Sequence, residues 1–131
     1  MNTNTKDIQV TSEKRTVVLG ASTNPARYSH RAVGLLLEKG IEPVPVGIKK
    51  GEIEGIPILN GEPEVEDVHT VTLYLNPERQ RPYYDYILGL HPKRIIFNPG
   101  TENPELIRLT REQGIEVEIA CTLTMLVIGN Y

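Results

Sequence analysis

The chain has 131 residues, a formal net charge of −3 and a single cysteine, Cys121. This length supplies one domain with a hydrophobic core but not two, and apolar and charged fractions of 39% and 24% exclude a disordered or fibrous protein. The acidic balance argues against a nucleic-acid partner, and one cysteine excludes an intrachain disulfide framework and a cysteine-based zinc site, as expected in a reducing compartment.

The first fourteen residues, MNTNTKDIQVTSEK, are polar and lack the apolar segment of a secretory signal peptide. The longest apolar runs are far shorter than the roughly 20 residues that span a bilayer. We therefore expect a flexible N-terminal arm over residues 1–14, one domain over residues 15–131, no membrane partner and a cytoplasmic location.

The first half of the chain predicts two buried strands joined by a helix. Residues 15–19 form a β-branched run, and residues 43–48 (PVPVGI) form a second strand whose prolines limit ladder hydrogen bonding on one side. Between them, Ser29 can cap a helix that has its apolar positions on one face and ends at Gly40. The polar connection that follows contains a brief extended piece over residues 56–58.

The second half alternates strands and helices in the same way. Strands are expected over residues 70–75, 93–97 and 115–119. The helix after the first of these has Asn76 as its cap, and Pro82 interrupts it early. Asn103 caps the next helix, and Thr122 can cap a last apolar helix over residues 123–128.

Strands that alternate with helices predict a parallel sheet covered on both faces. With right-handed crossovers, the default is a doubly wound, three-layer, Rossmann-like α/β fold with five parallel strands in the order 3-2-1-4-5. This order places the change in winding direction between the first and fourth strands. A ligand crevice is therefore expected between residues 20–29 and residues 98–101.

The turn after the first strand, GASTNP, differs from the G-x-G-x-x-G of an ordinary dinucleotide site. Gly20 permits a tight turn, and the small side chains of Ala21 and Ser22 leave the backbone amides free to face a ligand. The helix that starts near Ser29 points its free N–H groups and its positive dipole end into the same space. These features predict a phosphate or pyrophosphate site, and the alternative is a plain strand exit that binds no nucleotide.

The end of the second strand bears on which nucleotide is bound. An NAD enzyme places an acidic residue there to hold the ribose hydroxyls. Here Val46, Gly47 and Ile48 are followed by Lys49 and Lys50. Lysine suits a phosphate on the ribose, as in NADP or coenzyme A, and the alternative is a pair of solvated loop lysines.

Six stretches resemble a known family: VVLGASTNP, LLLEKGIEPVPV, GIPILNGEPEV, LYLNPE, GTENPEL and GIEVEIACTLTML. They resemble the small single-domain CoA-binding proteins, whose fold is like the CoA-binding domain of the succinyl-CoA synthetase α subunit. The resemblance runs from Arg15 to Cys121 with its spacings kept. It implies that the first turn binds pyrophosphate and that the loops after the second and third strands flank adenine and ribose.

Carried over residue by residue, the resemblance implies a site for coenzyme A or an acyl-CoA. The implied residues are Gly20, Ala21, Ser22, Tyr28 and Ser29 for the phosphates; Val46, Gly47 and Lys49 near the adenosine; Leu75 and Asn76 on the other wall; and Pro99 and Gly100 toward the pantetheine. The sequence departs from the family pattern where arginines often stand at residues 75–76, where Asn-Pro is common at residues 47–48, and where a glutamine-rich approach is common at residues 98–99.

No catalytic constellation can be assigned from the sequence. Cys121 follows the fifth strand and precedes a helix N-terminus that would lower its pKa, so it is either a reactive thiol or a small buried apolar residue. His30 lies beside the expected phosphate site and either helps to bind an anion or is plain surface. The three histidines lack metal-ligand spacing, and no metal site is expected.

The sequence therefore predicts a module that binds coenzyme A or an acyl-CoA and is non-catalytic or regulatory. An NADP-dependent oxidoreductase, or another nucleotide-using enzyme, is the alternative. It requires a substrate domain or a proton donor that the sequence does not display. A third hypothesis is an interaction module that forms homo-oligomers through the apolar segment of residues 123–131.

Overall fold

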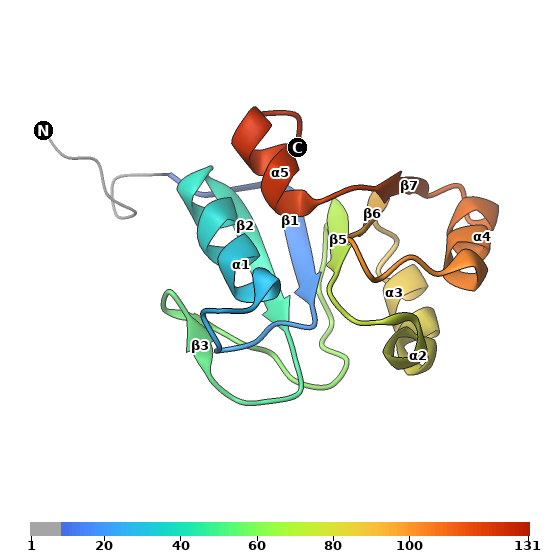
Figure 1. The fold of residues 1–131 in the computed structure, drawn as a ribbon, viewed down its shortest axis with the longest axis horizontal. Helices are drawn as coiled ribbons and strands as arrows, with labels where there is room; N and C mark the ends of the chain where they lie inside the picture. Colours follow the sequence, from blue (N-terminus) through green and yellow to red (C-terminus); the bar gives the residue numbers. More distant parts are fainter. Residues whose placement is uncertain (1–8) are drawn as a thin grey trace, which may run out of the picture.

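Five parallel strands form the centre of the protein (Figure 1). The computed structural model describes residues 9–131, and its main sheet has the order β2-β1-β5-β6-β7. Its strands are β1 (Thr11–Leu19), β2 (Ile41–Val46), β5 (Thr70–Leu73), β6 (Arg94–Phe97) and β7 (Glu116–Ile119), and every neighbouring pair is parallel. Two short strands, β3 (Glu52–Ile53) and β4 (Ile56–Pro57), form a separate antiparallel pair. The α/β class is confirmed.

The expected 3-2-1-4-5 pattern is present when the segment at Leu59 is counted as its third member. Leu59 makes an isolated parallel bridge with Val46, supported by hydrogen bonds from Leu59 N to Pro45 O and from Gly47 N to Leu59 O, both of 2.9 Å. The order across the sheet is then the Leu59 segment, β2, β1, β5 and β6, with β7 beyond. Residues 70–75, which the sequence places third, instead form β5 in the fourth position.

The winding direction of the chain consequently changes between β1 and β5. The expected crevice between residues 20–29 and residues 98–101 is wrong by one strand, because β5 rather than β6 lies beside β1. Contact at the strand ends shows this directly: a Cβ on Gly20 would lie 3.1 Å from the carbonyl carbon of Tyr74. Residues 98–101 follow one strand farther along the same edge.

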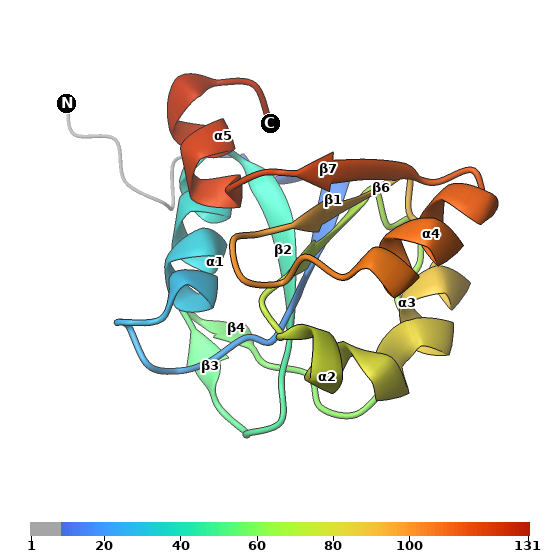
Figure 2. The same ribbon diagram turned by 45° about the vertical axis from the view of Figure 1, so that its right-hand side comes forward.

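Helices cover both faces of the sheet, which confirms the three layers (Figures 1 and 2). α1 (Tyr28–Glu38) and α5 (Thr122–Ile128) pack on one face, around a core that includes Val18, Val33, Leu36 and Leu126. The other face carries α2 (Pro77–Gln80), the 3-10 helix η1 (Arg81–Tyr83), α3 (Tyr84–Gly89) and α4 (Pro104–Glu112), around a core that includes Leu19, Leu73, Phe97 and Leu106. None of the helices in residues 9–131 has the length and apolar character needed to cross a membrane.

Two of the expected helix caps are confirmed, both at Asn-Pro pairs. The side chain of Asn76 accepts a hydrogen bond from Arg79 N at 3.0 Å, and that of Asn103 accepts one from Glu105 N at 3.1 Å. Proline at the first helical position has no N–H to leave unpaired, so the two signals reinforce each other. The helix after Asn76 breaks at Pro82 into α2, η1 and α3, as predicted.

The other two expected caps are wrong. Ser29 lies inside the first turn of α1, and the residue before the helix, Arg27, makes no side-chain cap. Thr122 is the first residue of α5, and its hydroxyl pairs with that of Thr72 at 2.7 Å inside the core. In both cases the hydroxyl-bearing residue is buried against the rest of the fold and lies within the helix. The helix therefore starts one or two residues earlier than the cap pattern indicates.

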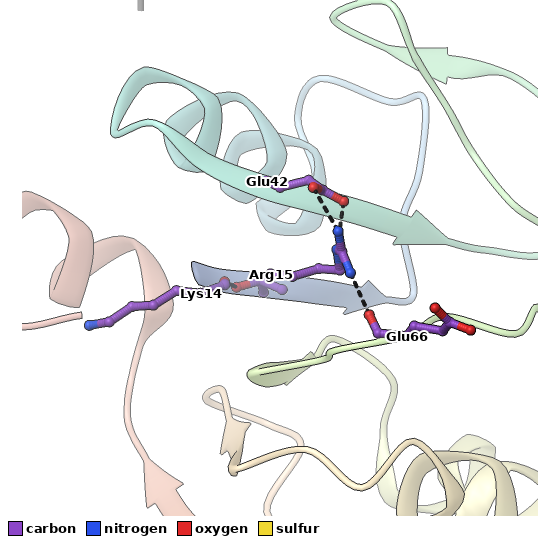
Figure 3. A network of polar contacts seen from close by, with 5 residues as sticks. Lys14, Arg15, Glu42 and Glu66 are labelled. Carbon is purple, nitrogen blue, oxygen red and sulfur yellow. Dashed lines mark hydrogen bonds and ion pairs between the residues drawn. The ribbon is translucent and has the colours of Figure 1, made fainter. Parts of the chain in front are cut away.

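The first strand begins earlier than the sequence pattern indicates. β1 starts at Thr11, so residues 11–14, expected in a flexible arm, belong to the strand, and the expected arm over residues 1–8 lies outside the described residues. Near the start of the sheet Arg15 joins three segments (Figure 3). Its Nε pairs with Glu42 Oε2 of β2 at 2.8 Å, and its Nη1 donates to Glu66 O at 2.6 Å. It thereby fastens the crossover that leads into β5.

Candidate functional site

The loops that follow the strands lie at the carboxyl edge of the sheet, where doubly wound sheets bind their ligands. Residues 20–27 after β1, residues 47–51 after β2 and residues 74–76 after β5 meet at the change in winding direction, which we call the switch point. Two glycines mark their closest approaches. A Cβ on Gly47 would collide with the carbonyl oxygen of Ala21, and one on Gly51 with the side chain of Thr23. The loop after β2 therefore packs directly on the turn after β1.

The first amides of the turn after β1 bind another part of the chain instead of facing a ligand as expected. Gly20 N and Ala21 N both donate to Val46 O, at 2.9 and 3.0 Å, so neither is free to bind a ligand. Within residues 9–131, the amides of Ser22 and Thr23 have no hydrogen-bond partner, and those of residues 28–30 are the unpaired first amides of α1. The free donors thus begin two residues later than predicted.

Asn24 shapes this turn. Its Oδ1 accepts a hydrogen bond from Ala26 N and its carbonyl oxygen accepts one from Arg27 N, both at 3.0 Å, while its own amide donates to Ser22 Oγ at 3.1 Å. These bonds make a compact turn immediately before α1. Sequence reasoning missed this role, although Asn before Pro is a recognised turn signal.

The first turn of α1 supplies two of the predicted residues and a positive region. Ser29 is 4% exposed, whereas Tyr28 is 65% exposed, with the Arg31 guanidinium 5.6 Å from its ring centroid. Arg27 is exposed beside them, and His30 is half-buried. The positive end of the helix dipole adds to these cations, so this part of the switch point favours an anion.

At the end of β2 the structure separates the three predicted residues. Val46 is 1% exposed, and its carbonyl oxygen already accepts hydrogen bonds from Gly20 N and Ala21 N, so its side chain belongs to the core; its place near the adenosine stays a prediction. Gly47 and Lys49 do lie in the loop, which Asn60 holds by donating from Nδ2 to Gly47 O at 2.8 Å and to Lys49 O at 3.1 Å. Lys49 and Lys50 are exposed.

Leu75 and Asn76 follow β5 on the opposite side of the switch point. A Cβ on Gly20 would lie 3.2 Å from Leu75 Cδ2, so Leu75 contacts the turn after β1. Asn76 is exposed, but its side-chain oxygen is committed to capping α2. Pro99 and Gly100 are exposed in the next loop. These four residues thus lie in two neighbouring loops at the same edge of the sheet, and their contact with a ligand stays a prediction.

Asn98 lies just before Pro99 and Gly100, and the sequence alone gives it no specific structural role. It is 3% exposed, and its Nδ2 donates to Thr72 Oγ1 at 2.7 Å and to Leu73 O at 2.9 Å. Its Oδ1 accepts a hydrogen bond from Thr122 N at 2.8 Å. Asn98 thus joins the end of β5, the loop after β6 and the start of α5. The signal in the sequence that could have indicated this role is a polar residue directly after a buried apolar strand.

Cys121 is half-buried at the start of α5. Burial alone would raise the pKa of its thiol, but hydrogen bonds from the Thr124 side chain and from the backbone amides of Thr124 and Leu123 outweigh burial and lower the pKa. Tyr74 lies on the same face of the sheet, and burial raises the pKa of its phenol. Its hydroxyl is near those of Thr72 and Thr122 but forms no hydrogen bond of ordinary geometry with a described residue.

Two shallow depressions lie away from the switch point. One is at the amino ends of β6 and β7, lined by His91, Lys93 and Gln113, and the other is between α4 and β7, lined by Pro104, Ile107 and Ile119. We place the candidate site at the switch point because free amides, closely packed glycines and basic side chains meet there. In the described part of the chain, no three His, Cys, Asp or Glu side chains are grouped so that they could hold a metal ion.

Residues 14–127 match the sequence model of a family described as CoA binding domain. The chain belongs to this CoA-binding domain family. The match covers all three loops of the switch point, and it also includes most of α5. A search of curated proteins finds no match.

Solved structures of similar chains agree with this CoA-binding domain assignment in their fold. An uncharacterized protein is 50% identical, with a TM-score of 0.89, and the match covers 92% of this chain and 100% of that one. A conserved hypothetical protein from Pyrococcus furiosus is 27% identical, with a TM-score of 0.73, over 88% and 98% of the two chains. A Thermus thermophilus protein is 24% identical, with a TM-score of 0.77, over 91% of each chain.

Proposed function

We propose that this protein binds coenzyme A or an acyl-CoA at the switch point and acts as a small non-catalytic or regulatory module. One observation supports this most: in a member of the CoA-binding domain family, the unpaired amides of Ser22, Thr23 and the first turn of α1 lie together where the winding direction changes. Such amides, with a helix dipole behind them, are suited to a pyrophosphate.

The rest of the ligand is assigned from the loops on either side. In this proposal Lys49 and Lys50, which are exposed in the loop after β2, pair with the phosphate on the ribose. On the other side, Leu75, Pro99 and Gly100 border the path of the pantetheine arm, which leads toward Cys121. Ser22 and Ser29 hydroxyls add donors for the phosphates.

An NADP-dependent oxidoreductase is the second candidate, because NADP also carries a pyrophosphate and a ribose phosphate. The lysines after β2 favour it as much as they favour coenzyme A. The two ligands differ beyond the pyrophosphate, where NADP continues into a second ribose and a nicotinamide and coenzyme A into a narrow flexible arm. The cytoplasmic location and self-association through residues 123–131 remain predictions; Val127 and Ile128 in that segment are exposed, whereas Met125 and Leu126 are buried.

Calorimetric titration of the purified protein with coenzyme A, dephospho-coenzyme A and NADP tests the proposal. We expect coenzyme A to bind with a micromolar or lower dissociation constant and NADP more weakly. Removing the 3′-phosphate should cost about 1 kcal/mol, because Lys49 and Lys50 are exposed and screened. Tightest binding of NADP would support the oxidoreductase, and no binding of any of the three would refute the proposal.

A further inference from the structure

A buried side-chain amide connects two loops at the carboxyl edge of the sheet. Gln80, the last residue of α2, is 0% exposed. Its Nε2 donates to Leu75 O and to Thr101 O, each at 2.8 Å, and its Oε1 accepts a hydrogen bond from Asn103 Nδ2, also at 2.8 Å. Both hydrogens of the amide are therefore used. We call the two bonds to Leu75 and Thr101 the Gln80 bridge.

The Gln80 bridge begins where strand pairing stops. β5 and β6 pair as far as Leu73 and Phe97, and the chain then leaves the sheet in two separate loops. Leu75 lies in the loop after β5 and Thr101 in the loop after β6. Thr101 is itself anchored, since its amide and hydroxyl donate to Asn98 O at 2.9 and 2.8 Å. The bridge thus fixes how far apart these two loops stand.

Burying the polar amide of Gln80 costs desolvation free energy, and this cost is not needed merely to fill the space. A side chain of similar volume without polar atoms would fill the same space, whereas each buried donor or acceptor must find a partner or lose free energy. Gln80 satisfies this requirement with carbonyl oxygens that belong to the loops rather than to its own helix. Leu75 also contacts Gly20 of the phosphate turn, so a shift of the loop after β5 reaches that turn as well.

We propose that Gln80 is a positioning residue for the pantetheine arm of the ligand. The inference rests on the proposed function, since it assumes that coenzyme A binds at the switch point. Leu75, Pro99 and Gly100 border the path of the arm, and the Gln80 bridge holds their loops in place before the ligand arrives. The loop after β2, at the adenosine end, is held separately by Asn60 and has no bond to Gln80.

Two ligands separate this role from simple support of the fold. Coenzyme A contains the pantetheine arm, and adenosine 3′,5′-bisphosphate lacks it. In Gln80→Met, which keeps the volume but removes the bridge, we expect the affinity for coenzyme A to fall about tenfold, because preorganisation of its wall is lost. The affinity for adenosine 3′,5′-bisphosphate should fall clearly less. Gln80→Asn, whose amide is too short to reach both carbonyls, should show the same selective loss to a smaller degree.

Thr110→Val is the matched control. Thr110 is also 0% exposed and lies on the same side of the sheet, but its hydroxyl donates only to Leu106 O within α4. It should leave both affinities unchanged. Unfolding by urea establishes that each variant is folded before it is titrated.

Amide hydrogen exchange of the wild-type protein gives a test without substitution. Coenzyme A, but not adenosine 3′,5′-bisphosphate, should slow exchange at Gly100, Thr101 and Glu102. The inference is overturned if coenzyme A leaves these amides unchanged, or if a folded Gln80 variant loses affinity for both ligands equally or for neither. If the wild-type protein binds neither ligand, the proposed function itself has failed and the failure is distinguishable from that of the Gln80 role.

Discussion

At the scale of single residues, Gly20 has a packing role that its glycine-containing turn did not predict. Its φ of +101° and the 3.1 Å from its ideal Cβ to the Tyr74 carbonyl carbon both require glycine. Its amide is bonded to Val46 O, and its missing Cβ lets the turn pack closely on Tyr74, so the structure gives this glycine a packing role; its contact with a phosphate stays a prediction. The unpaired amides, which we propose for the ligand, belong to Ser22 and Thr23, where any residue type can supply an N–H.

Cys121 permits a prediction at the same scale. We expect its thiolate to attack the disulfide bond of oxidised coenzyme A, forming a mixed disulfide and releasing one coenzyme A thiolate. Because hydrogen bonds lower its pKa, the thiolate persists to lower pH than in an ordinary cysteine, and the reaction should slow only as the pH falls through that lowered pKa. Intact-mass analysis over a pH series measures the adduct, which dithiothreitol should remove.

Two variants test this explanation of the reactivity. Cys121→Ser should form no adduct. Thr124→Val removes the side-chain hydrogen bond to the thiol and should shift the rate profile toward higher pH. An absent adduct in the wild-type protein would leave Cys121 as a half-buried structural residue.

At the scale of elements, the crossover from the β3–β4 pair to β5 is the longest stretch without regular structure inside the domain. It runs past the middle of β1, where Arg15 binds both Glu42 and the carbonyl of Glu66 (Figure 3). The pKa of Arg15 is raised, chiefly by its hydrogen bond to Glu42, so the guanidinium stays charged. This contact fastens the crossover that carries the chain to the other side of β1.

We expect Arg15→Met to lower the free energy of unfolding by about 1–2 kcal/mol, because a partly exposed ion pair and one hydrogen bond to a carbonyl are both lost. The side chains of Arg15 and Glu42 are 21% and 35% exposed. Arg108→Met is the control, because Arg108 pairs with Glu112 on the surface of α4 with exposures of 61% and 58%. Urea unfolding should show a change of less than about 0.5 kcal/mol for the control. Equal effects would contradict the assigned role.

At the scale of the whole molecule, ligand binding and stability are linked. A ligand that binds only the folded state stabilises it by about 2.7 kcal/mol at a hundred times its dissociation constant. Coenzyme A should therefore raise the melting temperature more than NADP does at equal concentration. The α1 dipole and the cations at the switch point make this effect dependent on ionic strength.

Lys49→Ala should weaken binding of coenzyme A about fivefold, because one screened ion pair of about 1 kcal/mol is lost, and should leave dephospho-coenzyme A unaffected. Lys93→Ala makes the same change of charge at the opposite end of the sheet and should alter neither ligand. Thermal unfolding with each ligand measures the shifts. An equal loss for both ligands in Lys49→Ala would place Lys49 away from the ribose phosphate.

The sequence by itself determined the class of fold and the approximate place of the main strands and helices, although several boundaries differ by one to four residues. Alternating β-branched runs and amphipathic segments place all five strands of the main sheet, and the Asn-Pro pairs at residues 76–77 and 103–104 start the helices where predicted. These signals are local. A proline, a helix cap or the alternation of apolar and polar residues along a strand affects only the few residues around it. The family resemblance extended them to a ligand class, since it covers the same turns.

Tertiary structure alone decided which groups face the switch point. The Leu59 segment is too short to be recognised as a strand, yet it pairs with Val46 at the outer side of β2, and residues 70–73 pair with β1. The switch point therefore lies between β1 and β5. Val46 O then takes the amides of Gly20 and Ala21, and Gln80 reaches carbonyls in two different loops. Hydrogen bonds between distant segments depend on which strands become neighbours, and no local periodicity in the chain encodes that choice.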